Sequence, residues 1–178
     1  MTSLIQNAAS FNITYRASSL TVRYNYEKPE NVFIDDDSSW FHSLNDAPNQ
    51  WWQVSFSKQV AISSYIIRTN NNYGNHPVSW HIDTSNDGVS WKTVHTVTGT
   101  DVGENTARFY PSTTINCVHF RIILDQNSSN SYVLAFTFFD CFGGLNTTQT
   151  NKVKCYCTGN NQCLLISQTF ILSLINIV

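Results

Sequence analysis

The stretch Asn49-Gln50-Trp51-Trp52-Gln53-Val54-Ser55-Phe56 joins two adjacent tryptophans to a run in which apolar and polar residues alternate. Successive side chains of a β-strand point to opposite faces, so Trp52, Val54 and Phe56 are predicted to share one face. Trp51 and the polar residues are predicted to share the other. A strand with large aromatic side chains on both faces is usually covered on both. The stretch therefore predicts a central strand of a β-sandwich.

Further strand signals follow at short intervals along the chain, in residues 19–24, 60–69, 78–84, 90–98, 106–110, 117–124 and 132–142. The turn Ser85-Asn86-Asp87-Gly88 separates two alternating runs, and Asp-Gly in that setting is a strong hairpin signal. Asn31 is predicted to cap a short turn. No stretch before Gly143 has a helical period, and Gly143-Gly144 is predicted to end the last strand. About eight short strands with turns between them indicate an all-β sandwich or jelly roll.

The chain divides by composition into two parts. Residues 1–144 are predicted to form one β-sandwich domain, which suits a chain of 178 residues. Residues 145–178 are predicted to be a linker followed by an apolar C-terminal tail. Because spanning a bilayer takes about 20 apolar residues and this tail has about 15, we expect an accessory strand, helix or extension. Membrane attachment through the tail is the alternative interpretation.

The charge pattern excludes one large class of partner. Charged residues make up 12% of the chain, the net charge is −2, and no run of Lys or Arg occurs. Nucleic-acid binding is therefore not expected, because it depends on clustered positive charge.

The cysteines and the N-terminus indicate a reduced compartment. Cys117 and Cys141 lie in apolar runs and are predicted to be buried thiols. Residues 1–11 have neither a basic start nor an apolar stretch of signal-peptide length, which predicts a cytoplasmic protein. The alternative is a membrane-associated or cell-surface protein held by the tail.

Catalytic motifs are missing from the sequence. The five histidines have no metal-ligand spacing, and the chain contains neither Gly-x-Ser-x-Gly nor a glycine-rich phosphate loop. The sequence therefore predicts a protein that is not an enzyme.

A set of motifs resembles the discoidin family, also called the factor V/factor VIII type C domain family. These motifs, within about residues 8–143, are Ala17-Ser18-Ser19, Asp35-Asp36-Asp37-Ser38-Ser39-Trp40, Gln50-Trp51-Trp52-Gln53-Val54, Ser79-Trp80, Ser85-Asn86-Asp87-Gly88-Val89-Ser90-Trp91, Phe120-Arg121-Ile122 and Phe139-Asp140-Cys141-Phe142-Gly143. The resemblance implies a galactose-binding-like jelly roll without catalytic activity. Members bind glycans, phospholipid head groups or proteins through loops at one end of the sandwich. Two departures are Ser55, where members commonly have Asp, and the absence of a cysteine near the N-terminus that could pair with Cys141.

The resemblance places the ligand-binding residues on three loops, which are rich in tyrosine and amide side chains. The predicted residues are Tyr24, Asn25 and Tyr26 in the first loop, Asn70, Asn71, Asn72, Tyr73 and His76 in the second, and Asn127 and Asn130 in the third. Amides offer both donors and acceptors to sugar hydroxyls, and an aromatic ring offers a stacking surface. Solvated polar loops and a core-anchoring tyrosine pair are the competing interpretations.

The resemblance also implies a structural calcium ion. Its ligands would be Asp35, Asp36 and Asp37 with Asp140 from the last strand, because hard carboxylate oxygens suit Ca²⁺. The alternative is that these aspartates hold turns by hydrogen bonds to backbone amides. No other cofactor is expected.

Three functions remain open at this point. The first is a non-catalytic module that recognises a galactose-like glycan. The second is an intracellular protein-interaction or scaffold module that uses the same loops. The third is a peripheral module that binds a phospholipid surface.

Overall fold

The computed structural model describes residues 2–6, 12–18, 27–35, 38–44, 47–69, 75–100, 102 and 106–145, together with the backbone of 154–158, 162–167 and 170–176. The chain falls into two compact units, Met1–Leu145 and Asn146–Val178.

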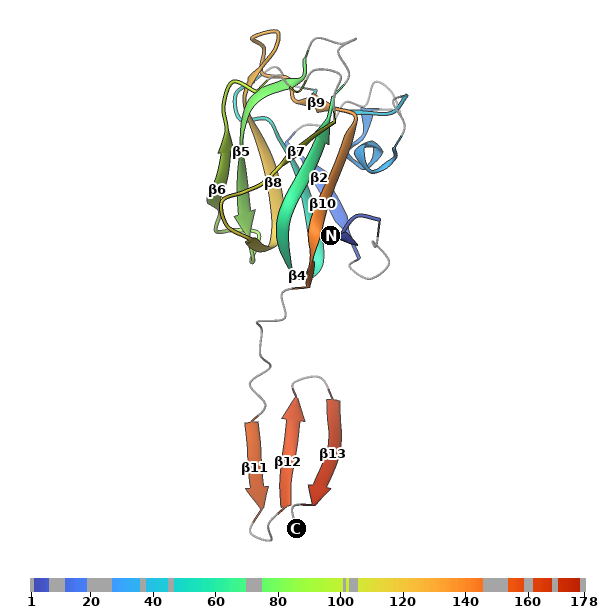
Figure 1. The fold of residues 1–178 in the computed structure, drawn as a ribbon, viewed down its shortest axis with the longest axis vertical. Helices are drawn as coiled ribbons and strands as arrows, with labels where there is room; N and C mark the ends of the chain where they lie inside the picture. The colour runs from blue at the N-terminus through green and yellow to red at the C-terminus, as the bar shows by residue number, and fades with distance from the viewer. Residues whose placement is uncertain are drawn as a thin grey trace. The chain divides into compact units, whose positions relative to one another are not determined.

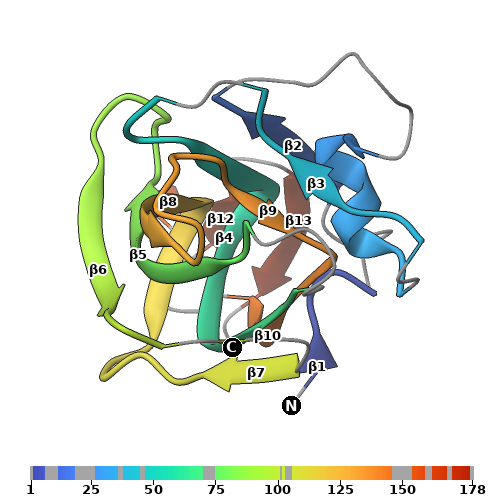
Figure 2. The ribbon, with the colours of Figure 1, turned by 90° about the horizontal axis from the view of Figure 1, so that it is seen from above.

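The first unit is an antiparallel β-structure, as the sequence predicted (Figures 1 and 2). Its main sheet has the order β1 (Thr2–Ser3), β10 (Phe138–Leu145), β4 (Trp51–Arg68), β8 (Ile115–Asn127), β5 (Pro77–Ser85) and β6 (Lys92–Val97), with β2 (Thr14–Ala17) and β7 (Thr106–Phe109) also paired to β4. A small second sheet pairs β3 (Phe41–His42) with β9 (Ala135–Phe136). Figure 2 looks along the strands, and there β5, β6 and β8 lie on one side of the core while β7 and β1 lie along another.

The strand β4 is the centre of this arrangement. The predicted strands around Trp51-Trp52 and over 60–69 are one strand of 18 residues, with an irregularity between Ser55 and Val60. On one edge of β4, β2 pairs before the irregularity and β10 after it. On the other edge, β8 pairs on both sides of the irregularity as far as Ile62, and β7 takes over from Tyr65. A strand that changes neighbours in this way joins the two layers of a sandwich. The prediction of a central strand is therefore confirmed.

The two tryptophans of β4 face opposite sides, as the alternation predicted. Trp52 and Val54 are fully buried, and the Trp52 ring packs against Phe136 and Phe139. On the outer face, the Arg121 guanidinium lies between two rings, 4.1 Å from the centroid of Trp51 and 3.6 Å from that of Trp91. Both faces of this strand are therefore covered, the outer one by stacked side chains rather than by a second sheet.

The predicted hairpin after β5 is confirmed. Strands β5 and β6 pair across the turn, where Gly88 has a φ of 74°, a value that favours glycine. One oxygen of Asp87, Oδ1, accepts hydrogen bonds of 2.8 Å from the Ser85 hydroxyl and from the backbone N–H groups of Val89 and Ser90. These donors hold the pKa of Asp87 well below its usual range, with the backbone groups contributing most.

The prediction that Gly143-Gly144 ends the last strand is wrong. Strand β10 continues through both glycines to Leu145, with a register shift between Phe142 and Gly143. A Cβ atom built on Gly143 would lie 1.8 Å from the carbonyl oxygen of Ala61. Gly143 therefore allows the backbones of β10 and β4 to approach closely. From the sequence alone, two adjacent glycines indicate the end of a strand.

Two other local predictions need correction. The predicted strand 132–142 is divided into β9 and β10, and residues 132–134 form no strand. Asn31 does not cap a turn, because the 3-10 helix η3 (Pro29–Phe33) begins before it and its N-cap residue is Lys28. The predicted strand 19–24 lies outside the described residues.

The two cysteines of the first unit are free and buried, as predicted. Burial raises the pKa of the Cys117 thiol to about 12 and that of Cys141 well above its usual value. Both thiols are therefore protonated and inert at neutral pH.

The second unit contains three described strands. Its backbone forms an antiparallel sheet of β11 (Lys154–Thr158), β12 (Gln162–Ser167) and β13 (Phe170–Asn176). Within the described parts of the chain, no helix has the length and apolar character that a membrane crossing requires.

Candidate ligand-binding loops

Two of the three predicted loops meet at one end of the sandwich. Strand β5 starts at Pro77 and β8 ends at Asn127, and these two residues are register partners. The chain before Pro77 and the chain after Asn127 therefore lie side by side. We call residues 75–76 and 127–132 the loop cluster.

Hydrogen bonds join the two sides of the loop cluster directly. The backbone N–H of Ser128 donates to the carbonyl oxygen of His76 at 3.0 Å, and the hydroxyl of Ser128 lies 3.3 Å from His76 Nδ1. The hydroxyl of Ser129 donates to Asn75 Oδ1 at 2.7 Å. His76 is buried, so its contacts with Ser128 help to fix the loop cluster.

Asn127 organises the loop from within. It is 1% exposed, and its Nδ2 group donates to the hydroxyl of Ser131 at 2.8 Å and to the carbonyl of Val133 at 2.9 Å. Its Oδ1 atom accepts the backbone N–H of Ser131 at 2.8 Å and lies 3.2 Å from the hydroxyl of Ser129. A side-chain amide has two donor hydrogens and two acceptor positions. A direct ligand contact, as predicted from the sequence, would therefore require Asn127 to break bonds that hold the loop.

Four residues of the loop cluster are exposed: Ser128, Ser129, Asn130 and Tyr132. The larger side chains among them are those of Asn130 and Tyr132. Asn130 is exposed and has a φ of 57°, a left-handed conformation that Asn tolerates better than most residues. Tyr132 is 46% exposed, and so it offers part of its ring to solvent beside the Asn130 loop. The sequence places Tyr132 in the third loop, with the same amide and aromatic chemistry as the second, but only Asn127 and Asn130 of that loop are among the predicted ligand residues.

The remaining predicted ligand residues lie outside the described part of the chain. They are Tyr24, Asn25 and Tyr26 of the first loop and Asn70, Asn71, Asn72 and Tyr73 of the second. Of the predicted set, the structure therefore places His76, Asn127 and Asn130, and it brings these three together.

The two described members of the predicted calcium site have other partners. Asp35 accepts a 2.6 Å hydrogen bond from the Arg68 guanidinium, which already neutralises its charge. Asp140 is 3% exposed and accepts hydrogen bonds from the Ser3 hydroxyl and the Cys141 backbone, while burial raises the pKa of its carboxyl. Asp36 and Asp37 lie outside the described residues. Among the residues that are described, no three His, Cys, Asp or Glu side chains gather in a way that could hold a metal ion.

A polar network on the outer face of β4 explains one departure from the family pattern. The Ser55 hydroxyl lies 2.8 Å from His119 Nδ1 and accepts a 2.8 Å hydrogen bond from the Gln53 amide. Burial and the charges of Arg16 and Arg121 lower the pKa of His119, which keeps the ring neutral at neutral pH. A neutral hydroxyl at position 55 suits a neutral imidazole. Gln53 also accepts hydrogen bonds from Arg121, so the network has a structural role.

Solved structures of sugar-binding modules have a similar fold. The Clostridium perfringens module CpGH89CBM32-5, in complex with GalNAc-β-1,3-galactose, superposes with a TM-score of 0.68 at 11% identity over 80% of this chain and 100% of that one. The family 32 module of C. perfringens NanJ, in complex with galactose, superposes with a TM-score of 0.63 at 16% identity, over 79% of this chain and 97% of that one. Chitosan-binding module 2 from a chitosanase/glucanase of Paenibacillus sp. IK-5, in complex with chitotriose, superposes with a TM-score of 0.61 at 17% identity. The match covers 74% of this chain and 97% of that one.

The sequence comparisons identify a family but no individual relative. No curated protein matches the chain at the level of an individual sequence. A family model, that of the F5/8 type C domain, matches residues 14–138, which is most of the chain and nearly all of the first unit. With the jelly-roll arrangement of strands around β4, this match shows that the chain belongs to the F5/8 type C, or discoidin, domain family.

Proposed function

We propose that this protein is a non-catalytic module that binds a galactose-like glycan at the loop cluster. The observation that carries the proposal is the pairing of a half-exposed aromatic ring, Tyr132, with the exposed amide of Asn130 on a loop that is fixed from within. A rigid loop loses little conformational entropy when a ligand binds.

In the proposed binding mechanism, some residues of the loop cluster contact the sugar and others hold the loop in place. The ring of Tyr132 stacks on the apolar face of a pyranose, and the Asn130 amide forms hydrogen bonds to its hydroxyls. Asn127 and His76 hold the loop by their bonds to Ser131 and Ser128. No bond is made or broken in the sugar, so the protein acts by recognition alone.

The similar structures support a sugar as the ligand class. Those named above were solved with GalNAc-β-1,3-galactose, galactose and chitotriose. Two of these three ligands contain galactose, which favours a galactose-type ligand over a chitosan-type one for the first tests.

Replacing Tyr132 with alanine should weaken glycan binding about tenfold. An aromatic contact contributes up to about 1.5 kcal/mol beyond burial, and about 1.4 kcal/mol corresponds to a factor of ten in Kd. Isothermal titration calorimetry with galactose and GalNAc-β-1,3-galactose measures the change. Tyr110→Ala is the matched control, because Tyr110 is 62% exposed and follows β7 at the far end from the loop cluster.

The competing functions have their own readouts on the same protein. A glycan array and calorimetry without binding, for a correctly folded chain, would contradict the proposal. Sedimentation of the chain with phosphatidylserine vesicles would then indicate a phospholipid-binding module. Recovery of a stoichiometric protein partner from cytosol would instead indicate a scaffold module.

A further inference from the structure

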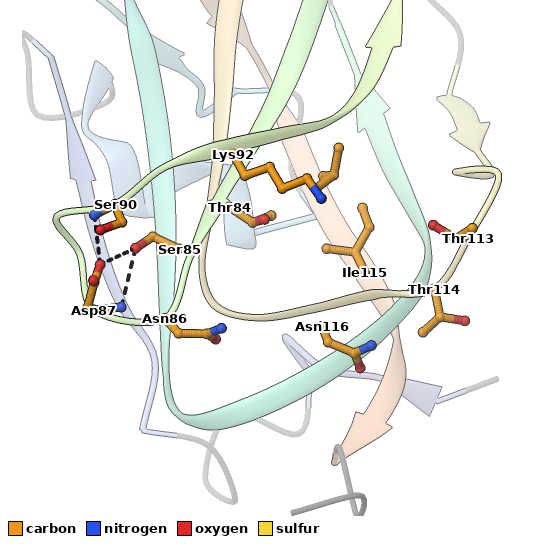
Figure 3. Close-up of a pocket in the computed structure, with 11 residues that line it drawn as sticks. Thr84, Ser85, Asn86, Asp87, Ser90, Lys92, Thr113, Thr114, Ile115 and Asn116 are labelled. Carbon is orange, nitrogen blue, oxygen red and sulfur yellow. Dashed lines mark hydrogen bonds between the residues drawn. The ribbon is translucent and has the colours of Figure 1, made fainter.

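A pocket of about 480 Å³ lies at the end of the sandwich opposite the loop cluster. The residues that line it come from the β5–β6 turn, from the start of β6 and from the segment before and into β8 (Figure 3). Strand β5 runs from Pro77, beside the loop cluster, to Ser85 in the pocket wall. Eight steps of about 3.3 Å each along the strand separate Pro77 from Ser85 by about 26 Å. We call this cavity the turn pocket.

Several polar side chains of the turn pocket have unused hydrogen-bonding capacity. The side chains of Thr84, Lys92, Thr113, Thr114 and Asn116 line it, and none of them forms a hydrogen bond or ion pair to any residue that the structure describes. The loop cluster differs, because its polar groups largely bond to one another. Convergent polar groups in a cavity of this size are typical of a small-molecule site.

One wall of the turn pocket, the turn between β5 and β6, is held by its own hydrogen bonds. The Ser85 hydroxyl donates to Asp87 and accepts the backbone N–H of Gly88 at 2.9 Å. The Asn86 side chain accepts a 3.0 Å hydrogen bond from Gln59 of β4. Val94 and the buried Ile115 add an apolar surface between the polar groups. A pre-formed wall reduces the entropy cost of binding.

The charges of the turn pocket define the kind of ligand. Figure 3 shows the Lys92 side chain running across the pocket toward Ile115, well apart from Asp87 at the turn. Asp87 directs Oδ1 to its own turn, where three donors bind it. The Lys92 ammonium group is positively charged and can only donate hydrogen bonds, so it favours an anionic acceptor on the ligand. The threonine and asparagine side chains can both donate and accept hydrogen bonds.

We propose that the turn pocket is a second ligand site, specific for a small sugar acid. The carboxylate of the ligand pairs with the Lys92 ammonium, and its hydroxyls bond to Thr84, Thr113 and Asn116. The apolar face of the ring contacts Val94 and Ile115. This site is independent of the loop cluster and of the ligand proposed for it.

Titration calorimetry of the full chain with sodium glucuronate and N-acetylneuraminate tests the site. We expect both sugar acids to bind, and Lys92→Gln to weaken binding tenfold or more because it removes the charge and keeps the length. Lys28→Gln is the matched control, since Lys28 is an exposed lysine beside η3. Tyr132→Ala should leave the affinity for sugar acids unchanged, which separates this site from the loop cluster.

Three results would overturn the proposal. The first is no binding of either sugar acid by the unmodified chain. The second is equal binding by glucose, which would show that the charge has no role. The third is equal binding by acetate and inorganic phosphate, which would reduce the pocket to a plain anion site without sugar recognition.

Discussion

Gly143→Ala is expected to lower the free energy of unfolding of the first unit by about 3 kcal/mol. A Cβ atom at this position would lie 1.8 Å from the carbonyl oxygen of Ala61 and 2.9 Å from its carbonyl carbon. Both contacts are to backbone atoms of the central strand β4, so no side-chain rotation relieves them. The overlap can be removed only by separating β10 from β4, which costs hydrogen bonds of the ladder that joins them. Urea unfolding followed by tryptophan fluorescence measures the change.

The neighbouring glycine supplies the control. A Cβ atom on Gly144 has no atom within 4 Å, so Gly144→Ala should leave stability unchanged or raise it by up to about 1 kcal/mol. Equal effects of the two substitutions would mean that the close approach of Gly143 to Ala61 does not exist in solution.

Trp52→Ala is expected to have the largest effect of any substitution in β4, about 4 kcal/mol of lost stability. The side chain is fully buried, its ring packs edge-on against Phe136 and Phe33, and its Nε1–H donates to the carbonyl oxygen of Pro29 at 3.0 Å. Truncation leaves a cavity that this many fixed rings cannot fill, and it leaves the Pro29 carbonyl without its donor. Thermal and urea unfolding both report the loss.

Trp51→Ala is the matched substitution on the opposite face. Its ring contacts the Arg121 guanidinium at 4.1 Å, and Arg121 keeps its contact with Trp91 and its hydrogen bonds to Gln53 when Trp51 is removed. A cation–π contact at a partly exposed site contributes about 1 kcal/mol, so the loss should be about that size. If Trp51→Ala costs as much as Trp52→Ala, the assignment of the two faces is wrong.

The parts of the fold that follow from local chemistry could be predicted from the sequence. Alternation assigns Trp52 and Val54 to the core because side-chain direction in a strand has a period of two. The Asp87-Gly88 hairpin follows from a turn whose bonds are all within six residues. The family resemblance, confirmed by the match to residues 14–138, supplied the arrangement of strands that alternation alone does not give.

The parts that depend on distant pairings could not be predicted from local patterns. The sequence around Gly143 indicates the end of a strand, and only the pairing with Ala61 shows that the strand continues. His76 and Ser128 are 52 residues apart in the chain, and only the β5–β8 pairing brings them into contact. The turn pocket combines Thr84 of β5 with Asn116 of β8, which only the β5–β8 pairing brings together.

The most direct test of glycan recognition at the loop cluster is a titration of the ¹⁵N-labelled chain with galactose, followed by amide chemical shifts. We predict that the largest shifts occur at Asn75, His76 and residues 128–132, with those at the turn pocket unchanged. Shifts confined to other surfaces, or no shifts at millimolar galactose, would contradict the assignment of the loop cluster as the glycan site.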